Sequence, residues 1–273
     1  MKKGKTILSE HFREYTLSDN ELKRLQGCLL EMFIDIKKLC DDNHILYMMS
    51  GGSCLGSVRH KGFIPWDDDI DIAMPREDYE KFLKIFPEYG KKNNLLAVNN
   101  RTKPYYGRPM TKVIDTRTSL TEPEYRSDDP IGVFVDIWVM DGVPDDASKG
   151  DWLKKMRREK EILFASVYKA TTQFSFVKNL AILLGRPINY KKRAEKFDKL
   201  ARTYKYEECD TVVNYIGMTK KLETYQKSWF GEGVLVDFEG YKFWAPVKYD
   251  KWLRARFGDY MQLPPENERI PHH

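Results

Sequence analysis

Cysteine is scarce in this sequence, and the few cysteines are not arranged in a motif. Only four occur among 273 residues, and no two of them form a Cys-x-x-Cys pair. The sequence therefore favours neither a zinc site nor a disulfide framework, and we expect a protein of a reducing, cytoplasmic compartment.

Long apolar runs are also missing. The longest, residues 174–184, is interrupted by Ser175, Lys178 and Asn179 and is too short to span a bilayer. We expect this run to form a core or amphipathic helix, with docking on a membrane surface as the less favoured alternative. Residues 1–5 are basic, but polar residues follow them instead of an apolar stretch, so we expect no signal peptide.

Neither sign of charge dominates. Lys and Arg number 46 against 41 Asp and Glu, which gives a net charge of +5. This excess is compatible with an anionic substrate or with peripheral association at the inner face of the plasma membrane, but it does not by itself indicate nucleic-acid binding. Apolar residues at 41% and charged residues at 32% are typical of a globular protein that is long enough to bury a core.

Hydrophobic periodicity predicts alternating helices and strands in the first half. Residues 18–42 have helical spacing and begin with a capping box, Ser18 and Glu21. Shorter helices are predicted over residues 55–60 and 76–86. Strands are predicted over residues 45–49, 69–74, 95–98, 110–115 and 133–139.

The second half of the sequence has a different composition. Residues 151–205 are rich in Lys and Arg at helical spacing, and residues 249–257 form a final predicted helix that ends at Gly258. We therefore predict an α/β (α+β) protein. Residues 1–148 form the catalytic core, a mixed sheet with flanking helices, and residues 149–273 form a mainly helical region packed on it.

Four aspartates within five positions are the strongest signal in the sequence. On a strand, alternate side chains share a face, so Asp67, Asp69 and Asp71 are predicted to lie together, with Ile70 and Ile72 facing the core. Neighbouring like charges are costly unless a cation compensates them. Magnesium is usually held by one or two carboxylates together with substrate phosphates. We predict that Asp69 and Asp71 bind Mg²⁺, or alternatively Mn²⁺, and not that they form a solvated acidic turn.

Asp136 is the favoured third acidic residue. It is a lone acid within the apolar segment 133–139, and we assign it a catalytic and metal-binding role. The alternative is a buried polar group that is satisfied by local hydrogen bonds. Asp141 is predicted to lie in a turn before Gly142 and to be structural.

A small turn precedes the acidic strand and is predicted to bind phosphate. Glycines at Gly51 and Gly52 let the backbone approach a phosphate, and Ser53 adds a hydroxyl donor. A Gly/Ser turn followed by Asp-x-Asp on the next strand is the arrangement of the nucleotidyltransferase fold.

Three further residues are candidates for substrate binding. Arg59 and Lys112 are cations able to neutralise a diphosphate, and Asp67 lies beside the predicted metal pair. The alternative for Arg59, with His60 and Lys61, is an exposed basic loop. His60 is a less favoured general base.

The residues from Gly51 to Asp71 resemble the signature of the LicD family, with its Pro-Trp-Asp-Asp-Asp-Ile-Asp core at residues 65–71. Residues 132–137 with 141–144, and residues 257–261 with 263–265, also resemble the family. The resemblance extends over residues 20–270.

The resemblance implies a nucleotidyltransferase-like fold and the transfer of a substituted phosphate from a CDP-linked donor, such as CDP-choline, to a sugar hydroxyl, with release of CMP. Bacterial members attach phosphocholine to teichoic acid or lipopolysaccharide. By position, Asp69 and Asp71 would be metal ligands, Asp136 the third acid, and Gly51 to Ser53 the donor-phosphate turn.

Two other functions remain open. One is a true nucleotidyltransferase that transfers a nucleoside monophosphate and releases pyrophosphate. The less favoured one is a nucleic-acid-binding protein, supported only by basic clusters at residues 154–158 and 191–193. Aromatic residues of the tail, including Trp229, Phe243 and Trp244, are predicted to pack in the core more readily than to form a cage for choline.

Overall fold

The computed structural model describes residues 17–103, 106, 110–120, 126, 131–170, 174–214 and 222–270. The basic segment 1–5, for which no signal peptide was expected, lies outside these ranges.

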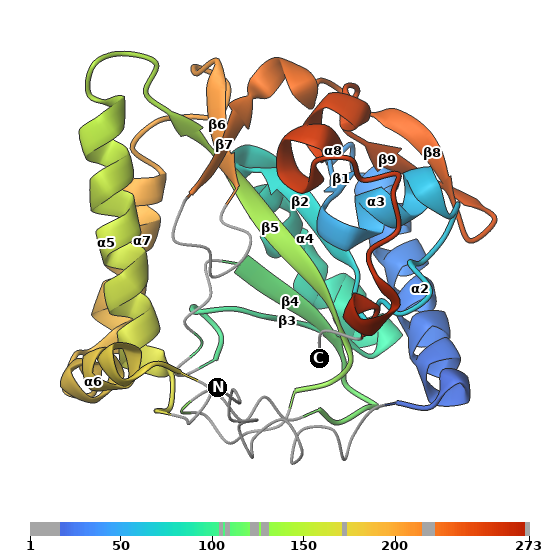
Figure 1. The fold of residues 1–273 in the computed structure, drawn as a ribbon, viewed down its shortest axis with the longest axis horizontal. Helices are drawn as coiled ribbons and strands as arrows, with labels where there is room; N and C mark the ends of the chain where they lie inside the picture. The colour runs from blue at the N-terminus through green and yellow to red at the C-terminus, as the bar shows by residue number, and fades with distance from the viewer. Residues whose placement is uncertain are drawn as a thin grey trace, which may run out of the picture.

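The centre of the molecule is one mixed sheet (Figure 1). The strand order is β1-β2-β5-β4-β3, and β6 adds to β5 and is in turn paired with β7. Strands β2 and β5 are parallel, and every other pair in this sheet is antiparallel. The strands are β1 (Met48–Met49), β2 (Asp71–Pro75), β3 (Leu95–Val98), β4 (Met110–Asp115), β5 (Phe134–Val143), β6 (Thr211–Asn214) and β7 (Glu223–Gln226).

One face of this sheet is buried against helices. Ile72 and Met74 of β2 lie beside Ile137 and Val139 of β5, and all four side chains are in the core. Helix α4 (Arg76–Asn93) contacts β2 and β5, and α2 (Asp19–Asp42) contacts α4 and β5. Because strand side chains alternate, the residues between these apolar ones point to the opposite face.

A layer of three helices lies at the β6 side of the sheet (Figure 1). These are α5 (Lys149–Val167), α6 (Phe176–Gly185) and α7 (Tyr190–Ala201), and they share a second apolar core centred on Trp152, Met156 and Phe197. The predicted helical character of residues 151–205 is confirmed.

The remaining elements cover the edge near β1. They are α3 (Gly51–Arg59), a hairpin of β8 (Val234–Phe238) and β9 (Tyr241–Ala245), α8 (Tyr249–Phe257), and two short 3₁₀ segments, η2 (Lys227–Trp229) and η3 (Glu266–Glu268). Phe33 of α2 stacks on Phe243 of β9 with ring centroids 3.9 Å apart, so the hairpin closes the main core.

Several predicted elements are confirmed, and others differ. The mixed α/β class, the Ser18–Glu21 capping box and the bounds of β3, β4 and α8 agree with prediction. Helix α3 begins at Gly51 and not at residue 55, and β2 begins at Asp71 and not at residue 69. Strands β6 to β9 were not predicted, so the region after residue 148 is less purely helical than expected.

Within the ranges that the structure covers, no helix has the length and apolar character needed to cross a membrane.

Candidate active site

The strand register places three charged residues in a row. In the parallel pair of β2 and β5, Asp71 lies opposite Asp136, and in the antiparallel pair of β5 and β4, Lys112 lies opposite Asp136. Side chains in register on neighbouring strands share a face, so all three lie on the face opposite α4. The sequence predicted these residues separately, and the fold brings them together.

Asp71 is held by three hydrogen bonds. Its backbone N–H donates to Ser53 Oγ at 2.8 Å, and its carbonyl accepts from the Ser50 N–H at 2.9 Å. Trp138 Nε1 donates to Asp71 Oδ1 at 2.7 Å. The turn that begins α3 and a neighbouring strand therefore fix both the backbone and the carboxylate of Asp71.

The first two residues of α3 must be glycines because the backbone there lies very close to two aspartate side chains. Gly51 has a φ of +52°, and a Cβ atom there would collide with the Asp71 carboxylate. A Cβ atom at Gly52 would likewise collide with the Asp67 carboxylate. The N-terminus of α3, which carries a partial positive charge and open N–H groups, is thus placed beside the acidic residues.

Asp67 and Asp69 do not lie on a strand, contrary to the prediction. Both are in the irregular segment just before β2, so strand alternation does not explain their positions. Both still lie near Asp71. The charge of Asp69 raises the pKa of Asp67 and of Asp71, which requires the three carboxylates to be close together. Asp67 is only 5% exposed, whereas Asp69 and Asp71 remain partly exposed.

The carboxylates repel one another in a poorly solvated setting. Burial, reinforced by the charges of Asp69 and Asp136, raises the pKa of Asp71 to about 8. Burial and the charges of Asp69 and Asp71 raise the pKa of Asp67 to about 9. The hydrogen bond from Trp138 and the charge of Arg256 act in the opposite direction on the pKa of Asp71. Such a site gains from an added cation.

The residues fit a magnesium ion whose ligands come partly from protein carboxylates and partly from a substrate phosphate. Across the described ranges, no three Asp, Glu, His or Cys side chains form a ready-made metal cage. Magnesium does not require one, because it is commonly bound by one or two carboxylates, waters and substrate phosphates. The mutual repulsion at Asp67, Asp69 and Asp71, beside the N-terminus of α3, suits this partial kind of site.

Lys112 is fully buried and acts on Asp136. Its Nζ lies 3.3 Å from Asp136 Oδ1 and 2.9 Å from the centroid of the Phe134 ring. Asp136 therefore has a cation of the protein beside its carboxylate.

Arg59 is not brought to the carboxylates. It lies at the far end of α3, where its Nη1 donates to the Tyr260 carbonyl at 2.7 Å and to the Gln262 carbonyl at 3.2 Å. His60 lies edge-on to Trp66, with ring centroids 6.4 Å apart. The end of α3 thus contacts the C-terminal part of the chain.

Two residues near Asp71 were not assigned a role from the sequence. Trp138 follows Asp136 by two positions on β5, so strand alternation was a usable signal for it. Arg256, on α8, pairs with Glu223 of β7 and acts electrostatically on Asp71. It is far from the acidic motif in the sequence, and no local pattern indicates it.

Asp141 is structural, as predicted, although it lies within β5 and not in a turn. Its two carboxylate oxygens accept from Arg76 Nε at 2.7 Å and Nη2 at 2.6 Å. The aromatic residues of the tail also mainly pack, since Phe230 and Phe243 are buried in the main core.

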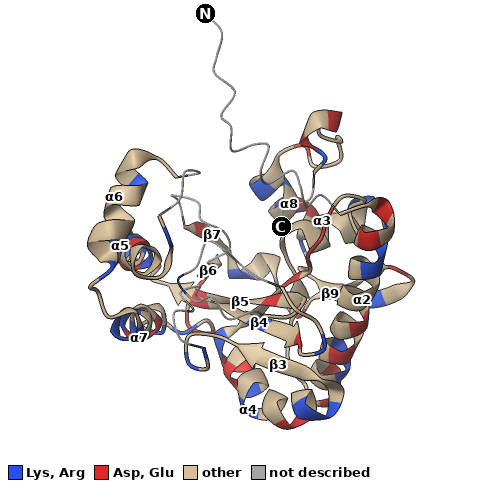
Figure 2. Cartoon of the chain, turned by 90° about the horizontal axis from the view of Figure 1, so that it is seen from below, with Lys and Arg blue, Asp and Glu red and all other residues tan. Residues whose placement is uncertain are grey.

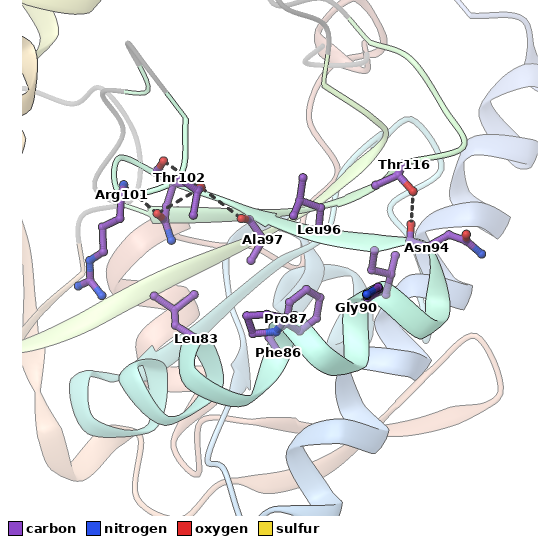
Figure 3. Close-up of a pocket in the computed structure, with 13 residues that line it drawn as sticks. Leu83, Phe86, Pro87, Gly90, Asn94, Leu96, Ala97, Arg101, Thr102 and Thr116 are labelled. Carbon is purple, nitrogen blue, oxygen red and sulfur yellow. Dashed lines mark hydrogen bonds between the residues drawn. The ribbon is translucent and has the colours of Figure 1, made fainter.

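A separate cavity of about 620 Å³ lies between α4 and β3 (Figure 3). Leu83, Phe86, Leu96 and Arg101 are among the residues that line it, and none of the predicted site residues does.

These features define a mixed α/β protein with an acidic site where β2, β5 and the start of α3 meet. A family model described as "LicD/FKTN/FKRP, nucleotidyltransferase domain" matches residues 44–178, which include Asp67, Asp71 and Asp136. The chain is 32% identical to the lipopolysaccharide cholinephosphotransferase LicD of Haemophilus influenzae over 275 residues, 96% of this chain and 97% of that protein. The chain belongs to the LicD family.

Two uncharacterised rickettsial proteins match a shorter part. The chain is 38% identical to one from Rickettsia typhi and 37% identical to one from Rickettsia prowazekii, each over 89 residues or 30% of this chain. The matched segment covers 29% of the first protein and 34% of the second. These two matches add no information on activity.

Proposed function

We propose that this protein is a Mg²⁺-dependent transferase that moves phosphocholine from CDP-choline to a sugar hydroxyl of a cell-surface glycan and releases CMP. Lipopolysaccharide is the first acceptor to test, and teichoic acid the second. The observation that carries the proposal is the alignment of Asp71 with Asp136 beside the glycine start of α3. Near full-length similarity to a lipopolysaccharide cholinephosphotransferase supports the choice of donor and acceptor.

The acidic residues would hold the metal and the donor. Asp69 and Asp71 are the proposed ligands, with Asp136 adjoining them. A bound magnesium ion would neutralise charge on the diphosphate and on the departing CMP. The N–H groups at Gly51 and Gly52 and the Ser53 hydroxyl border the same space and are proposed to face the donor phosphates. Asp67, against Gly52, borders it from the loop side.

Asp136 is the proposed general base. The acceptor hydroxyl oxygen would attack the phosphorus of the phosphocholine group, the bond to the CMP oxygen would break, and Asp136 would accept the hydroxyl proton. General bases typically contribute about 10²–10⁴-fold to rate. Because Lys112 is buried against Asp136, we propose that it orients this carboxylate and does not contact the donor directly.

Product analysis tests the reaction. With labelled CDP-choline, Mg²⁺ and a lipopolysaccharide acceptor, we expect CMP and glycan-bound phosphocholine in equal amounts. Asp71→Asn should abolish turnover and remain folded, whereas Asp237→Asn, an exposed aspartate of β8, should remain active. Full activity of a folded Asp71→Asn variant would contradict the proposal.

A nucleotidyltransferase is the second candidate, because the matching family model is described by that term. It predicts pyrophosphate release from CTP in place of CMP release from CDP-choline. A thermal-shift panel of CDP-choline, CDP-ribitol, CDP-glycerol, CTP and UDP-sugars, each with and without Mg²⁺, identifies the donor head group. The four cysteines are free thiols, which supports the proposal of a cytoplasmic location.

A further inference from the structure

The outward face of α6 is apolar. Five large hydrophobic side chains of this ten-residue helix are strongly exposed: Phe176 (82%), Val177 (75%), Leu184 (69%), Leu183 (46%) and Leu180 (45%). At 100° per residue they form one continuous stripe along the helix. A surface helix normally turns such a stripe to the core, so α6 has the reverse orientation.

This orientation is fixed by packing on α5. Ile182 is fully buried in the core of the three-helix layer. Gly185 lies so close to α5 that a Cβ atom there would collide with the Ala165 carbonyl. The amine of Lys178 lies over the Phe174 ring, with Nζ 3.8 Å from the ring centroid. The apolar stripe therefore belongs to the folded state.

The surroundings of α6 are basic. Residues 149–201 contain 14 Lys and Arg against 5 Asp and Glu, a net charge of +9, while the whole chain has only +5. Arg186 directly follows α6, Lys191 and Lys192 lie in the first turn of α7, and all three are exposed. None of the three forms an ion pair with a residue that the structure describes.

We propose that α6 docks the protein on a membrane surface that contains anionic lipids. The apolar stripe would enter the boundary between headgroups and acyl chains, and Arg186, Lys191 and Lys192 would contact lipid phosphates. Ten residues make a helix of about 15 Å, half of the hydrocarbon thickness of about 30 Å, so α6 would lie in the plane of the surface.

Charge selects this partner over two others. A second copy of the chain would bring an equally basic layer against the first, and like charges would oppose that contact. A nucleic acid would match the basic residues but leave the apolar stripe in water. An anionic bilayer matches both features.

The position of α6 also suits a substrate held at a membrane. Figure 2 shows α6 on the side of the sheet occupied by α3 and α8, away from α4. Asp71 and Asp136 face this same side. The docking proposal does not depend on the proposed reaction, because it requires only a lipid surface.

Vesicle co-sedimentation tests the proposal on the full chain. We expect binding to phosphatidylcholine vesicles that contain phosphatidylglycerol, with little binding to phosphatidylcholine alone. Phe176→Ser combined with Leu184→Ser should weaken binding by about 10-fold or more, because two inserted apolar side chains are lost. The matched control is Leu96→Ser combined with Leu263→Ser, two leucines that are each 51% exposed elsewhere.

The charge contribution is tested separately. Lys191→Glu combined with Lys192→Glu should weaken binding to the anionic vesicles by about 10-fold. The same change at Lys91 and Lys92, exposed at the end of α4, should have little effect. Thermal unfolding of each variant checks that it is folded.

Three results would overturn the proposal. These are no binding to anionic vesicles, equal binding by the α6 variants and their controls, or a concentration-dependent dimer in light scattering that the α6 variants abolish.

Discussion

Asp71 combines a firmly fixed geometry with an unfavourable electrostatic setting. Ser53 and Trp138 hold its backbone and carboxylate, while burial and neighbouring acids oppose its ionisation. A structural aspartate of this fold, Asp141, is instead neutralised by two hydrogen bonds from Arg76. The contrast supports the proposal that a bound cation balances the charge at Asp71.

Stability in the absence of metal should fall as pH rises. The folded pKa of Asp71, about 8, and that of Asp67, about 9, exceed the ordinary value of 3.8. Between these values the folded state binds more protons than the unfolded state, so the free energy of unfolding decreases with pH. Thermal unfolding in EDTA should therefore show a midpoint that declines from pH 5.5 to 9. Asp71→Asn should reduce the decline, and Asp237→Asn should not. A midpoint that is constant or rises would contradict the assignment.

Gly51→Ala should damage both stability and activity. A left-handed backbone costs a non-glycine residue about 1–2 kcal/mol, and here the added Cβ also displaces the Asp71 carboxylate. Gly240→Ala is the matched control, since Gly240 has a φ of +79° but open space around it. Urea unfolding should show a larger loss for Gly51→Ala, and only this variant should lose activity. Equal effects in the two variants would argue against close packing on Asp71.

At the scale of elements, β2, β5 and α4 are held together by an ion pair. Arg76 begins α4 directly after β2, and its guanidinium reaches Asp141 on β5, whose side chain is 1% exposed. The same guanidinium contacts Asp198 of α7 at 3.0 Å. This cluster joins the sheet to the helical layer.

Asp141→Asn should therefore destabilise the protein by about 3 kcal/mol, because it leaves the partly buried guanidinium of Arg76 without its main partner. The folded fraction should keep its activity, since Asp141 lies away from the carboxylate site. Glu77→Gln, an exposed acid in the same turn of α4, should change stability by less than about 0.5 kcal/mol. Chemical denaturation measures both, and equal stabilities would refute the role of the pair.

Elements with strong local signals could be predicted from the sequence. The Ser18 capping box, the alternation in β4 and the stop at Gly258 each depend on residues close in the chain. The β8–β9 hairpin was missed because its turn uses Glu239 and Gly240, both with positive φ, and not the common Asn-Gly or Asp-Gly pair. Strand β6 was missed because four buried residues show no alternation.

The candidate site could be predicted in its residues but not in its arrangement. Asp71 and Asp136 stood out as acids in apolar segments, yet their alignment depends on a parallel pairing of strands that are far apart in sequence. Arg256 reaches the site only through the packing of α8 against β7, which no short motif encodes.

At the scale of the whole molecule, charge is divided unevenly. The small net charge of +5 conceals a layer of +9 in residues 149–201, and the rest of the chain is net acidic. The exposed apolar stripe of α6 distinguishes one face of this basic layer from the others. The average composition does not show this difference.

The acidic site is proposed to bind a CDP-linked donor together with a divalent cation. Isothermal titration calorimetry of CDP-choline, with Mg²⁺ or with EDTA, tests it on the wild-type chain and on Asp71→Asn. We expect binding that requires Mg²⁺ and that Asp71→Asn weakens by about 10-fold or more. Equally tight binding in EDTA, or binding that Asp71→Asn leaves unchanged, would contradict the claim.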